Sequence, residues 1–229
     1  MKHLYEQVAA SYDKWYTTPK GRIVDRIEKE ALYAYLQPHK GLKLLDIGCG
    51  TGQYALELAG LGLEVNGIDI SAAMLSQAQA KTEKAGLTVD LRVGDALKLP
   101  FGEQTFDLVL SVTALEFVPA LPAALQEAFR VLKAGGRLVV GLIAKNSPWE
   151  QYYLEKARRN PAGIFNHARF YTLNELLAAM PGRQVEGRAV LFLPPDFDFS
   201  REKEALALEA AAVHAGRTDG GFICALSVK

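Results

Sequence analysis

Three glycines stand close together at the end of an apolar run early in the chain. The stretch LLDIGCGTGQYALELA, residues 44–59, places Gly48, Gly50 and Gly52 between a strand-like run and a helix-like pattern. A backbone without side chains turns sharply and lets a ligand approach the start of a helix closely. Gln53 stands where the dinucleotide pattern G-x-G-x-x-G has its third glycine. We therefore expect a small molecule at this turn, but not one held by its phosphates.

Acidic side chains accompany the loop, and the sequence has no G-x-x-x-x-G-K-[ST] phosphate motif. Asp46 precedes the glycines, where its charge would repel a phosphate and attract an ammonium group. Asp69, in GIDIS, follows the first glycine by about twenty residues, the position of a carboxylate that accepts ribose hydroxyls. Asp95, in VGDALKLP, could hold an adenine edge, although alone it could simply cap a turn. Together these residues indicate an adenosine joined to an amino-acid tail.

The elements that must position these residues alternate between strand and helix. An amphipathic helix over 21–36, ended by Pro38, precedes the first strand. Ser71 is the expected N-cap and Gly86 the expected end of one later helix. The expected strands are 42–48, 63–70, 88–95, 105–112 and 137–144, and the helices between them are 53–62, 72–85 and 121–136, the last with a glycine stop. This alternation predicts right-handed crossovers and a mostly parallel, doubly wound sheet.

The pattern changes after the fifth strand. Residues 145–171 look irregular and are rich in aromatic and basic side chains, while Thr172 is a candidate cap for a helix within 171–180. Strands at 184–193 and 221–229 close the chain, with an alanine-rich helix over 201–214 between them.

Composition excludes several classes of protein. A 229-residue chain with 49% hydrophobic residues can bury one substantial core. Twenty-six basic residues balance twenty-six acidic ones, which argues against broad nucleic-acid binding. No stretch predicts a signal peptide or a membrane span, so we expect a cytoplasmic location. Cys49 and Cys224 form no CxxC pair or metal cluster, so we expect packing roles and no metal.

Five segments, in order, resemble the motifs of the class I S-adenosylmethionine-dependent methyltransferases, and of small-molecule enzymes of the UbiE type in particular. They are LLDIGCGTG, GIDIS, GDALKLPF, FDLVLSVTALEFV and LKAGGRLVVG, within residues 43–143. The resemblance implies an α/β fold: a Rossmann-like, doubly wound, seven-stranded, mostly parallel sheet with an antiparallel closing strand and an N-terminal helical lid. The extra helix at 201–214 departs from the family pattern and leaves the pairing of the closing edge open.

The resemblance also implies a division of one methyltransferase domain and a set of cofactor contacts. Residues 1–40 would be the lid and first helix, 41–143 the cofactor-binding core, 144–171 an acceptor-side insertion, and 172–229 the C-terminal helix and closing strands. The glycine loop would line the methionine part of S-adenosylmethionine, and Asp69 would hold the ribose. The expected cofactor-binding residues are Asp46, Gly48, Cys49, Gly50, Gly52, Asp69, Ile70, Met74, Gly94, Asp95, Ala96, Ser111 and Val112.

Aromatic residues surround the expected acceptor space. In related enzymes a YD.WY segment before the sheet folds over the cofactor, and the insertion after the fifth strand forms the opposite wall. The expected acceptor-binding residues are Tyr5, Tyr12, Trp15, Phe117, Phe165, Phe170 and Tyr171. Rings of this kind also serve as ordinary core packing.

The catalytic assignment stays open, because a sulfonium methyl group is already activated. An oxygen or carbon acceptor needs a base, for which Tyr12, Glu116 and His167 are available. The plainer expectation is a solvated charge at Glu116 and a partly exposed loop residue at His167. The basic cluster at 156–159 is expected to be a solvated helix face, with an anion site as the alternative.

The sequence thus predicts methyl transfer to a small molecule by in-line displacement, with an aromatic or quinone-like ring as the favoured acceptor. A nucleic-acid base is disfavoured, because SVTALEF follows the fourth strand where a D/N-P-P-Y motif would stand, and there is no Pro-Cys nucleophile. A protein-directed methyltransferase and a non-catalytic cofactor sensor are the alternatives. The oligomeric state is open.

Overall fold

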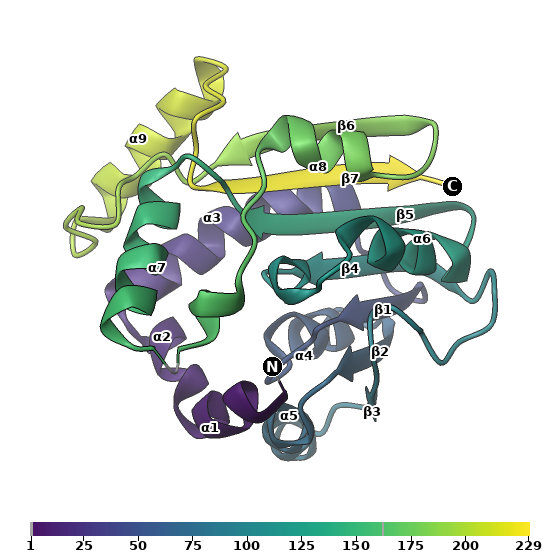
Figure 1. Cartoon of the computed structure of the whole chain (residues 1–229). Helices are drawn as coiled ribbons and strands as arrows, with labels where there is room; N and C mark the ends of the chain where they lie inside the picture. The colour runs from purple at the N-terminus through teal and green to yellow at the C-terminus, as the bar shows by residue number, and fades with distance from the viewer. Residues whose placement is uncertain (1, 162) are drawn as a thin grey trace.

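A seven-stranded sheet runs through the centre of the protein, with helices on both faces (Figure 1). The computed structural model describes residues 2–161 and 163–229. The strand order is β3-β2-β1-β4-β5-β7-β6, and β7 runs antiparallel to both of its neighbours. The strands are β1 (Lys43–Ile47), β2 (Glu64–Asp69), β3 (Val89–Val93), β4 (Phe106–Val112), β5 (Leu132–Ile143), β6 (Gln184–Val190) and β7 (Phe222–Val228). The predicted fold class, a mostly parallel sheet with an antiparallel closing strand, is confirmed.

The helices follow the capping signals of the sequence closely. Ser71 Oγ accepts the Met74 N–H, and Thr172 forms a reciprocal capping box with Glu175. Gly86 ends its helix in the left-handed region, at φ 64°. The helices are α1 (Lys2–Tyr12), α2 (Lys14–Thr17), α3 (Pro19–Leu36), α4 (Gln53–Gly60), α5 (Ala72–Ala85), η1 (Leu115–Phe117), α6 (Leu121–Val131), α7 (Pro148–Arg159), η2 (Ile164–His167), α8 (Leu173–Ala179) and α9 (Glu202–His214).

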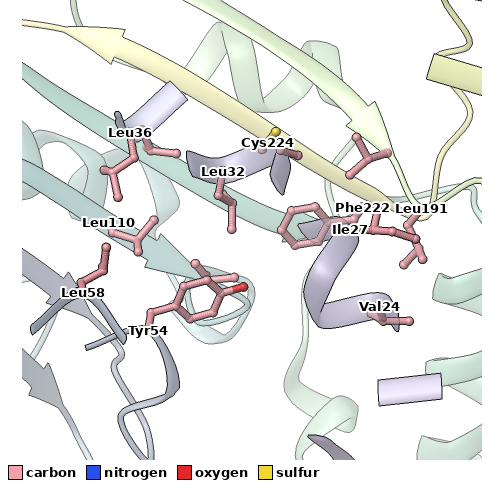
Figure 2. Packing of buried hydrophobic residues seen from close by; sticks show 14 of the residues in the cluster. Val24, Ile27, Leu32, Leu36, Tyr54, Leu58, Leu110, Leu191, Phe222 and Cys224 are labelled. Carbon is pink, nitrogen blue, oxygen red and sulfur yellow. The ribbon is translucent and has the colours of Figure 1, made fainter. Parts of the chain in front are cut away.

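The core lies on the two faces of the sheet. Successive residues of the strands face opposite sides, so that Val139 packs with α3 and α4 while Val140 packs with α6 and α8. Figure 2 shows the first of these faces, where α3 lies across β7 and the fully buried ring of Phe222. A Cβ atom at Gly141 would lie 2.3 Å from Phe222 Cζ, so the glycine makes room for this ring. Burial of apolar side chains on both faces fixes the sheet register.

The expected helix over 121–136 is wrong at its C-terminal end. α6 ends at Val131, and Leu132 already pairs with Phe106 as the first residue of β5. The pairing shifts register before Arg137, and Gly135, at φ 76°, donates its N–H to the Lys229 carbonyl at 2.7 Å. Gly135 and Gly136 therefore lie in the irregular first part of β5 and do not end a helix.

Residues 148–159 form a helix in a region that we expected to be irregular. Ser147 caps α7 by accepting the Glu150 N–H at 3.1 Å, and Pro148 occupies the first turn. Ser147, Pro148 and Glu150 form a typical helix N-terminus. The many aromatic residues of the segment led us to expect irregular structure instead. The basic cluster at its end lies in the last turn, where it complements the helix dipole.

Several N-terminal and inserted helices gather beyond the carboxyl ends of the parallel strands. α1, α2 and α7 lie together on the left in Figure 1, the side toward which β1 and β4 point. Ligands of open α/β sheets bind at this edge, near the switch in strand order, which here lies between β1 and β4. Within the described residues, no helix is both long and apolar enough to span a membrane.

Candidate functional site

The glycine loop connects β1 to α4 through left-handed backbone. Gly48, Gly50 and Gly52 have φ values of 73°, 54° and 82°, which glycine adopts without steric cost. A Cβ atom at Gly48 would lie 2.3 Å from Ala114 Cβ, and one at Gly52 would lie 2.5 Å from Leu56 Cδ1. At Gly50 a Cβ atom would meet nothing within 4 Å. Close neighbours and left-handed backbone thus favour glycine at positions 48 and 52, while Gly50 faces open space.

Asp69 ties this loop to the end of β2. Its Oδ2 accepts the Gly50 N–H at 2.9 Å, and its Oδ1 accepts the Ser71 N–H at 2.8 Å. Burial raises the pKa of Asp69 above its usual value, and the hydrogen bonds from backbone N–H groups oppose that rise. Each carboxylate oxygen keeps further acceptor capacity, so Asp69 can also accept hydroxyl groups of a ligand.

A first cavity of about 310 Å³ opens beside Asp69 and the glycine loop. This volume lies at the lower end of the ~300–1,000 Å³ typical of small-molecule sites. Nine of the thirteen expected cofactor residues line it, namely Gly48, Gly50, Asp69, Ile70, Met74, Gly94, Asp95, Ala96 and Val112. Ile70 is 40% exposed, which leaves its apolar side chain free to meet a flat ring.

The other four expected cofactor residues do not line the first cavity. Asp46 and Cys49 line a small neighbouring cavity of about 30 Å³. Ser111 is buried and donates its hydroxyl to the Ile47 carbonyl at 2.9 Å, which joins β4 to β1 below the loop. Gly52 is the N-cap position of α4. In this structure Ser111 and Gly52 therefore shape the loop from behind.

A second cavity of about 240 Å³ adjoins the first, and four residues, Tyr5, Tyr12, Thr113 and Phe117, line both. Its wall is rich in aromatic rings from α1, α2, α7 and η2. The described lining residues are Tyr5, Val8, Tyr12, Trp15, Tyr16, Val24, Asp25, Glu28, Thr113, Phe117, Ile143, Trp149, Tyr153, Lys156, Ile164, Phe165, Leu191 and Gly221. Phe117 meets Tyr5 edge to face at 5.7 Å between ring centroids, and Tyr153 stacks on Phe165 at 4.2 Å. These pairs connect the N-terminal helices to the inserted segment.

Five of the seven expected acceptor residues line the second cavity, and two do not. Phe170 packs against the apolar core, and Tyr171 forms an isolated bridge with Ala144. His167 is exposed at the end of η2, as expected. The residues that sequence reasoning missed are Tyr16, Asp25, Glu28, Trp149 and Tyr153. The two acids lie in a helix whose spacing had indicated packing alone.

Asp13, between α1 and α2, fastens the N-terminal helices to the core. Its Oδ1 accepts Thr51 Oγ1 at 2.6 Å and Gln53 Nε2 at 3.0 Å, and its Oδ2 accepts Lys81 Nζ at 2.8 Å. Burial raises the pKa of Asp13, but the hydrogen bonds from Lys81, Thr51 and Gln53 outweigh it and hold that pKa below its usual value. Gln53, which replaces the third glycine of the dinucleotide pattern, thus contacts the N-terminal segment, whose Tyr5 and Tyr12 line both cavities.

Glu116 is fully buried, so the expectation of a solvated charge is wrong. Its Oε1 accepts the Ile143 N–H at 2.9 Å, while Oε2 is buried and has no partner among the described residues. Burial raises the pKa of Glu116 to about 7, and burial together with the nearby Asp69 raises that of Asp46 to about 7. Two carboxyl groups near the cavities therefore titrate close to neutral pH.

Within residues 2–161 and 163–229, no three His, Cys, Asp or Glu side chains are placed to hold a metal ion.

Comparison with known proteins points to one family. Residues 45–140 match the family model described as a methyltransferase domain. An uncharacterised protein of Mycobacterium tuberculosis is 36% identical over 190 residues, which are 82% of this chain and 62% of that protein. The ubiquinone/menaquinone biosynthesis C-methyltransferase UbiE of Cereibacter sphaeroides is 36% identical over 141 residues, 60% of this chain and 56% of the enzyme. The chain spans about three fifths of the length of these curated relatives.

A solved structure from Thermotoga maritima has the same fold. It is described as a SAM-dependent methyltransferase and possible histamine N-methyltransferase, and it superposes with a TM-score of 0.77 at 24% identity, covering 100% of this chain and 99% of that one. At this identity the likeness concerns the fold alone.

Replacing Asp13 by alanine is expected to free α1 and α2. The change removes three hydrogen bonds and leaves the buried Thr51 hydroxyl unpaired. Because the Asp13–Lys81 pair is partly exposed, we expect a loss of only about 1–2 kcal/mol, or roughly 5–30-fold faster amide exchange over residues 2–17. Hydrogen exchange by mass spectrometry measures this, with Asp90→Ala on the exposed β3 as the control. The pKa of Asp13 is lowered in the folded protein. The difference in exchange rate between Asp13→Ala and the unchanged protein should therefore be fully developed above about pH 4 and vanish in more acid solution. Equal amide exchange over residues 2–17 in Asp13→Ala and Asp90→Ala would show that Asp13 does not hold the N-terminal helices to the core.

Replacing Glu116 by glutamine should change how stability depends on pH. The pKa of a buried acid such as Glu116 is higher in the folded protein than in the unfolded chain. As the pH rises, the unfolded chain loses the proton first, so the free energy of unfolding decreases until the pH exceeds the folded pKa. Between pH 5 and pH 8 the unfolding free energy of Glu116→Gln should therefore rise by about 2–4 kcal/mol relative to that of the unchanged protein. Urea unfolding at both pH values measures this, with the exposed Glu103→Gln as control. A difference that does not vary with pH would show that Glu116 is not held in its neutral form.

Proposed function

We propose that this chain, which belongs to the class I S-adenosylmethionine-dependent methyltransferases, transfers the methyl group of that cofactor to a small-molecule acceptor. The main support for this proposal is that the two cavities adjoin directly. They share the lining residues Tyr5, Tyr12, Thr113 and Phe117. The first cavity has the polar groups for a nucleoside, and the second has space for another molecule beside it.

The residues of the first cavity fit S-adenosylmethionine. Asp69 retains acceptor capacity for the ribose hydroxyls, and the open space at Gly50 admits a ligand against the backbone. Ile70 and Met74 offer apolar contact for adenine, and Asp95 and Ala96 lie at the same cavity wall. The two acidic groups Asp46 and Asp69 suit a ligand that carries positive charge and no phosphate.

The chain's own residues would position the acceptor and exclude water. The bound cofactor supplies an electrophilic methyl group on a positively charged sulfur. Phe117 and Tyr5 meet at the junction of the cavities, where the negative faces of aromatic rings favour positive charge. Asp13 keeps the N-terminal helices over the junction, which lowers the access of water and favours in-line approach. We propose that residues 1–40 cover the site and that 144–171 form the acceptor wall of one methyltransferase domain.

The size of the second cavity favours a small acceptor over a protein. A volume of about 240 Å³, lined by rings of α1, α2, η1, α7 and η2, holds a small molecule but not a folded surface. The names of two relatives also refer to small molecules: the Cereibacter enzyme is named for ubiquinone and menaquinone biosynthesis, and the Thermotoga protein is described as a possible histamine N-methyltransferase. The balanced net charge gives no reason to expect a nucleic acid. A sensor that binds the cofactor without catalysis would have the same first cavity, but no use for the second.

Titration calorimetry with S-adenosylmethionine, followed by methyl transfer from labelled cofactor to metabolite extracts, tests the proposal. We expect saturable binding and a labelled small molecule. Absence of cofactor binding would overturn the proposal, and labelled protein in place of a labelled metabolite would favour the protein-directed alternative. Binding without any labelled product across many extracts would favour the sensor.

Replacing Asp69 by alanine should weaken cofactor binding without unfolding the protein. The change removes the carboxylate that we assign to the ribose, at a cost of about 1–3 kcal/mol, or roughly 5–150-fold in Kd. Calorimetry measures Kd, and circular dichroism checks the fold. Asp90→Ala, on the neighbouring strand but exposed, should bind the cofactor normally. An unchanged Kd for Asp69→Ala would place the ligand elsewhere.

A further inference from the structure

The second cavity combines aromatic walls with acidic side chains from one helix. Asp25 and Glu28 project from α3 into a lining that otherwise consists mainly of rings and aliphatic groups. Lys156 is the one basic residue among the described lining residues, and it is exposed at the rim. Its Nζ lies 4.4 Å from the centre of the Tyr152 ring and 5.8 Å from that of Tyr153. The cavity therefore combines acidic and aromatic groups inside, and Lys156 lies at its edge.

Glu28 is the most exceptional of these groups, because it makes no hydrogen bond or ion pair with any described residue. Burial and the nearby Asp25 raise its pKa well above the usual value. A carboxyl group that lines a cavity without a partner is costly unless a ligand or water satisfies it. Its environment therefore favours a ligand with donor groups and positive charge.

The other acids around the cavity are also incompletely satisfied. Asp25 Oδ2 is paired with Lys29 Nζ at 2.8 Å, but its Oδ1 is buried and has no partner among the described residues. Glu116, whose Oε2 likewise has none, is held by the N–H of Ile143, itself a lining residue. Phe117, next to Glu116 in the chain, lines both cavities. Two acids of α3 thus line the cavity, and a third, Glu116, is buried behind its wall next to Phe117.

Aromatic rings complete a site suited to an organic cation. Trp15, Tyr16, Trp149 and Tyr153 line the same cavity as Glu28. Aromatic faces attract ammonium groups, and the attraction increases when water is excluded. A neutral quinone-like ring could pack against these walls, but it would leave Glu28 without a donor, and a carboxylate-bearing acceptor would be repelled by it.

We propose that the acceptor is a small amine, bound as an ammonium ion between Glu28 and the aromatic walls of the second cavity and methylated on nitrogen. This inference rests on the proposed methyltransferase function and narrows its acceptor class. It differs from the quinone-like ring that the sequence favoured, because the two acids of α3 could not be placed at the cavity from the sequence.

Glu28 can accept the proton that the ammonium group must lose before its nitrogen is methylated. The bound ammonium gives one proton to the Glu28 carboxylate, which frees the nitrogen lone pair. That pair forms the N–CH₃ bond as the S–CH₃ bond of S-adenosylmethionine breaks, and sulfur keeps the bonding electrons as a neutral thioether. The methylated ammonium leaves, Glu28 passes its proton to water, and one proton is released per methyl group. The raised pKa of Glu28 makes its carboxylate a better proton acceptor than an exposed one.

The two tryptophans of the chain, Trp15 and Trp149, both line the second cavity, so their fluorescence reports its occupant. The protein is saturated with S-adenosylhomocysteine and titrated at pH 7 with benzylamine and 2-phenylethylamine, and with the matching alcohols. We expect at least one amine to bind at least tenfold more tightly than its alcohol. Glu28→Gln should reduce amine affinity at least tenfold and leave alcohol and S-adenosylhomocysteine binding within twofold. Glu28→Asp should retain part of the preference, and Glu30→Gln, exposed on the same helix, should retain all of it.

The outcomes separate this inference from the proposed function. Failure of the unchanged protein to bind S-adenosylhomocysteine would count against the methyltransferase site itself. Normal binding of that compound with no preference for either amine, or an equal loss of amine and alcohol binding in Glu28→Gln, would overturn the amine site alone. A labelled extract product that carries its new methyl group on oxygen or carbon would overturn it as well.

Discussion

The arrangement of both cavities depends on one carboxylate, Asp13, which joins three separate parts of the chain. Its partners are Thr51 of the glycine loop, Gln53 at the start of α4, and Lys81 of α5. These bonds hold α1 and α2 beyond the carboxyl ends of the strands, where Tyr5, Tyr12 and Trp15 complete the cavity walls. The loop that would receive the cofactor and the segment that covers it are therefore one hydrogen-bonded unit, so their geometry cannot vary independently.

Burial then determines the character of the acids in this unit. Burial raises the pKa of Asp46, Glu28 and Glu116, most completely for Asp46 and Glu116, whose side chains are nearly inaccessible to solvent. Burial raises the pKa of Asp69 as well, but there two backbone N–H groups, of Gly50 and Ser71, stabilise the charged form in part. The charged form of Asp69 is thus partly stabilised, while burial favours the neutral form of the other three acids. A site with such groups responds to the charge of its occupant as well as to its shape.

Local signals explain how much could be predicted from the sequence. Ser71, Gly86 and Thr172 act within one helical turn of themselves, and the strands alternate regularly, so the sheet and most helices followed from short-range patterns. The tether of Asp13 to Lys81 joins residues 68 positions apart, and no local pattern encodes it. The burial of Glu116 and the exposure of Glu28 to a cavity likewise depend on which surfaces meet in three dimensions. The sequence predicts aromatic residues around an acceptor space, and five of those seven line the second cavity, but their acidic neighbours on α3 were missed for this reason.

The position of β7 has a consequence for the order in which the molecule assembles. Residues 222–228 lie between β5 and β6 and pair with both along their length, although β6 and α9 precede them in the chain. On the ribosome, β5 would emerge with its outer edge unpaired and β6 would have no strand to join until more than thirty further residues had been synthesised. Such non-local pairing slows folding, and an open edge can associate with other chains. Co-translational completion of this half of the sheet must therefore wait for β7, whereas the β1–β4 half can form earlier from strands already present.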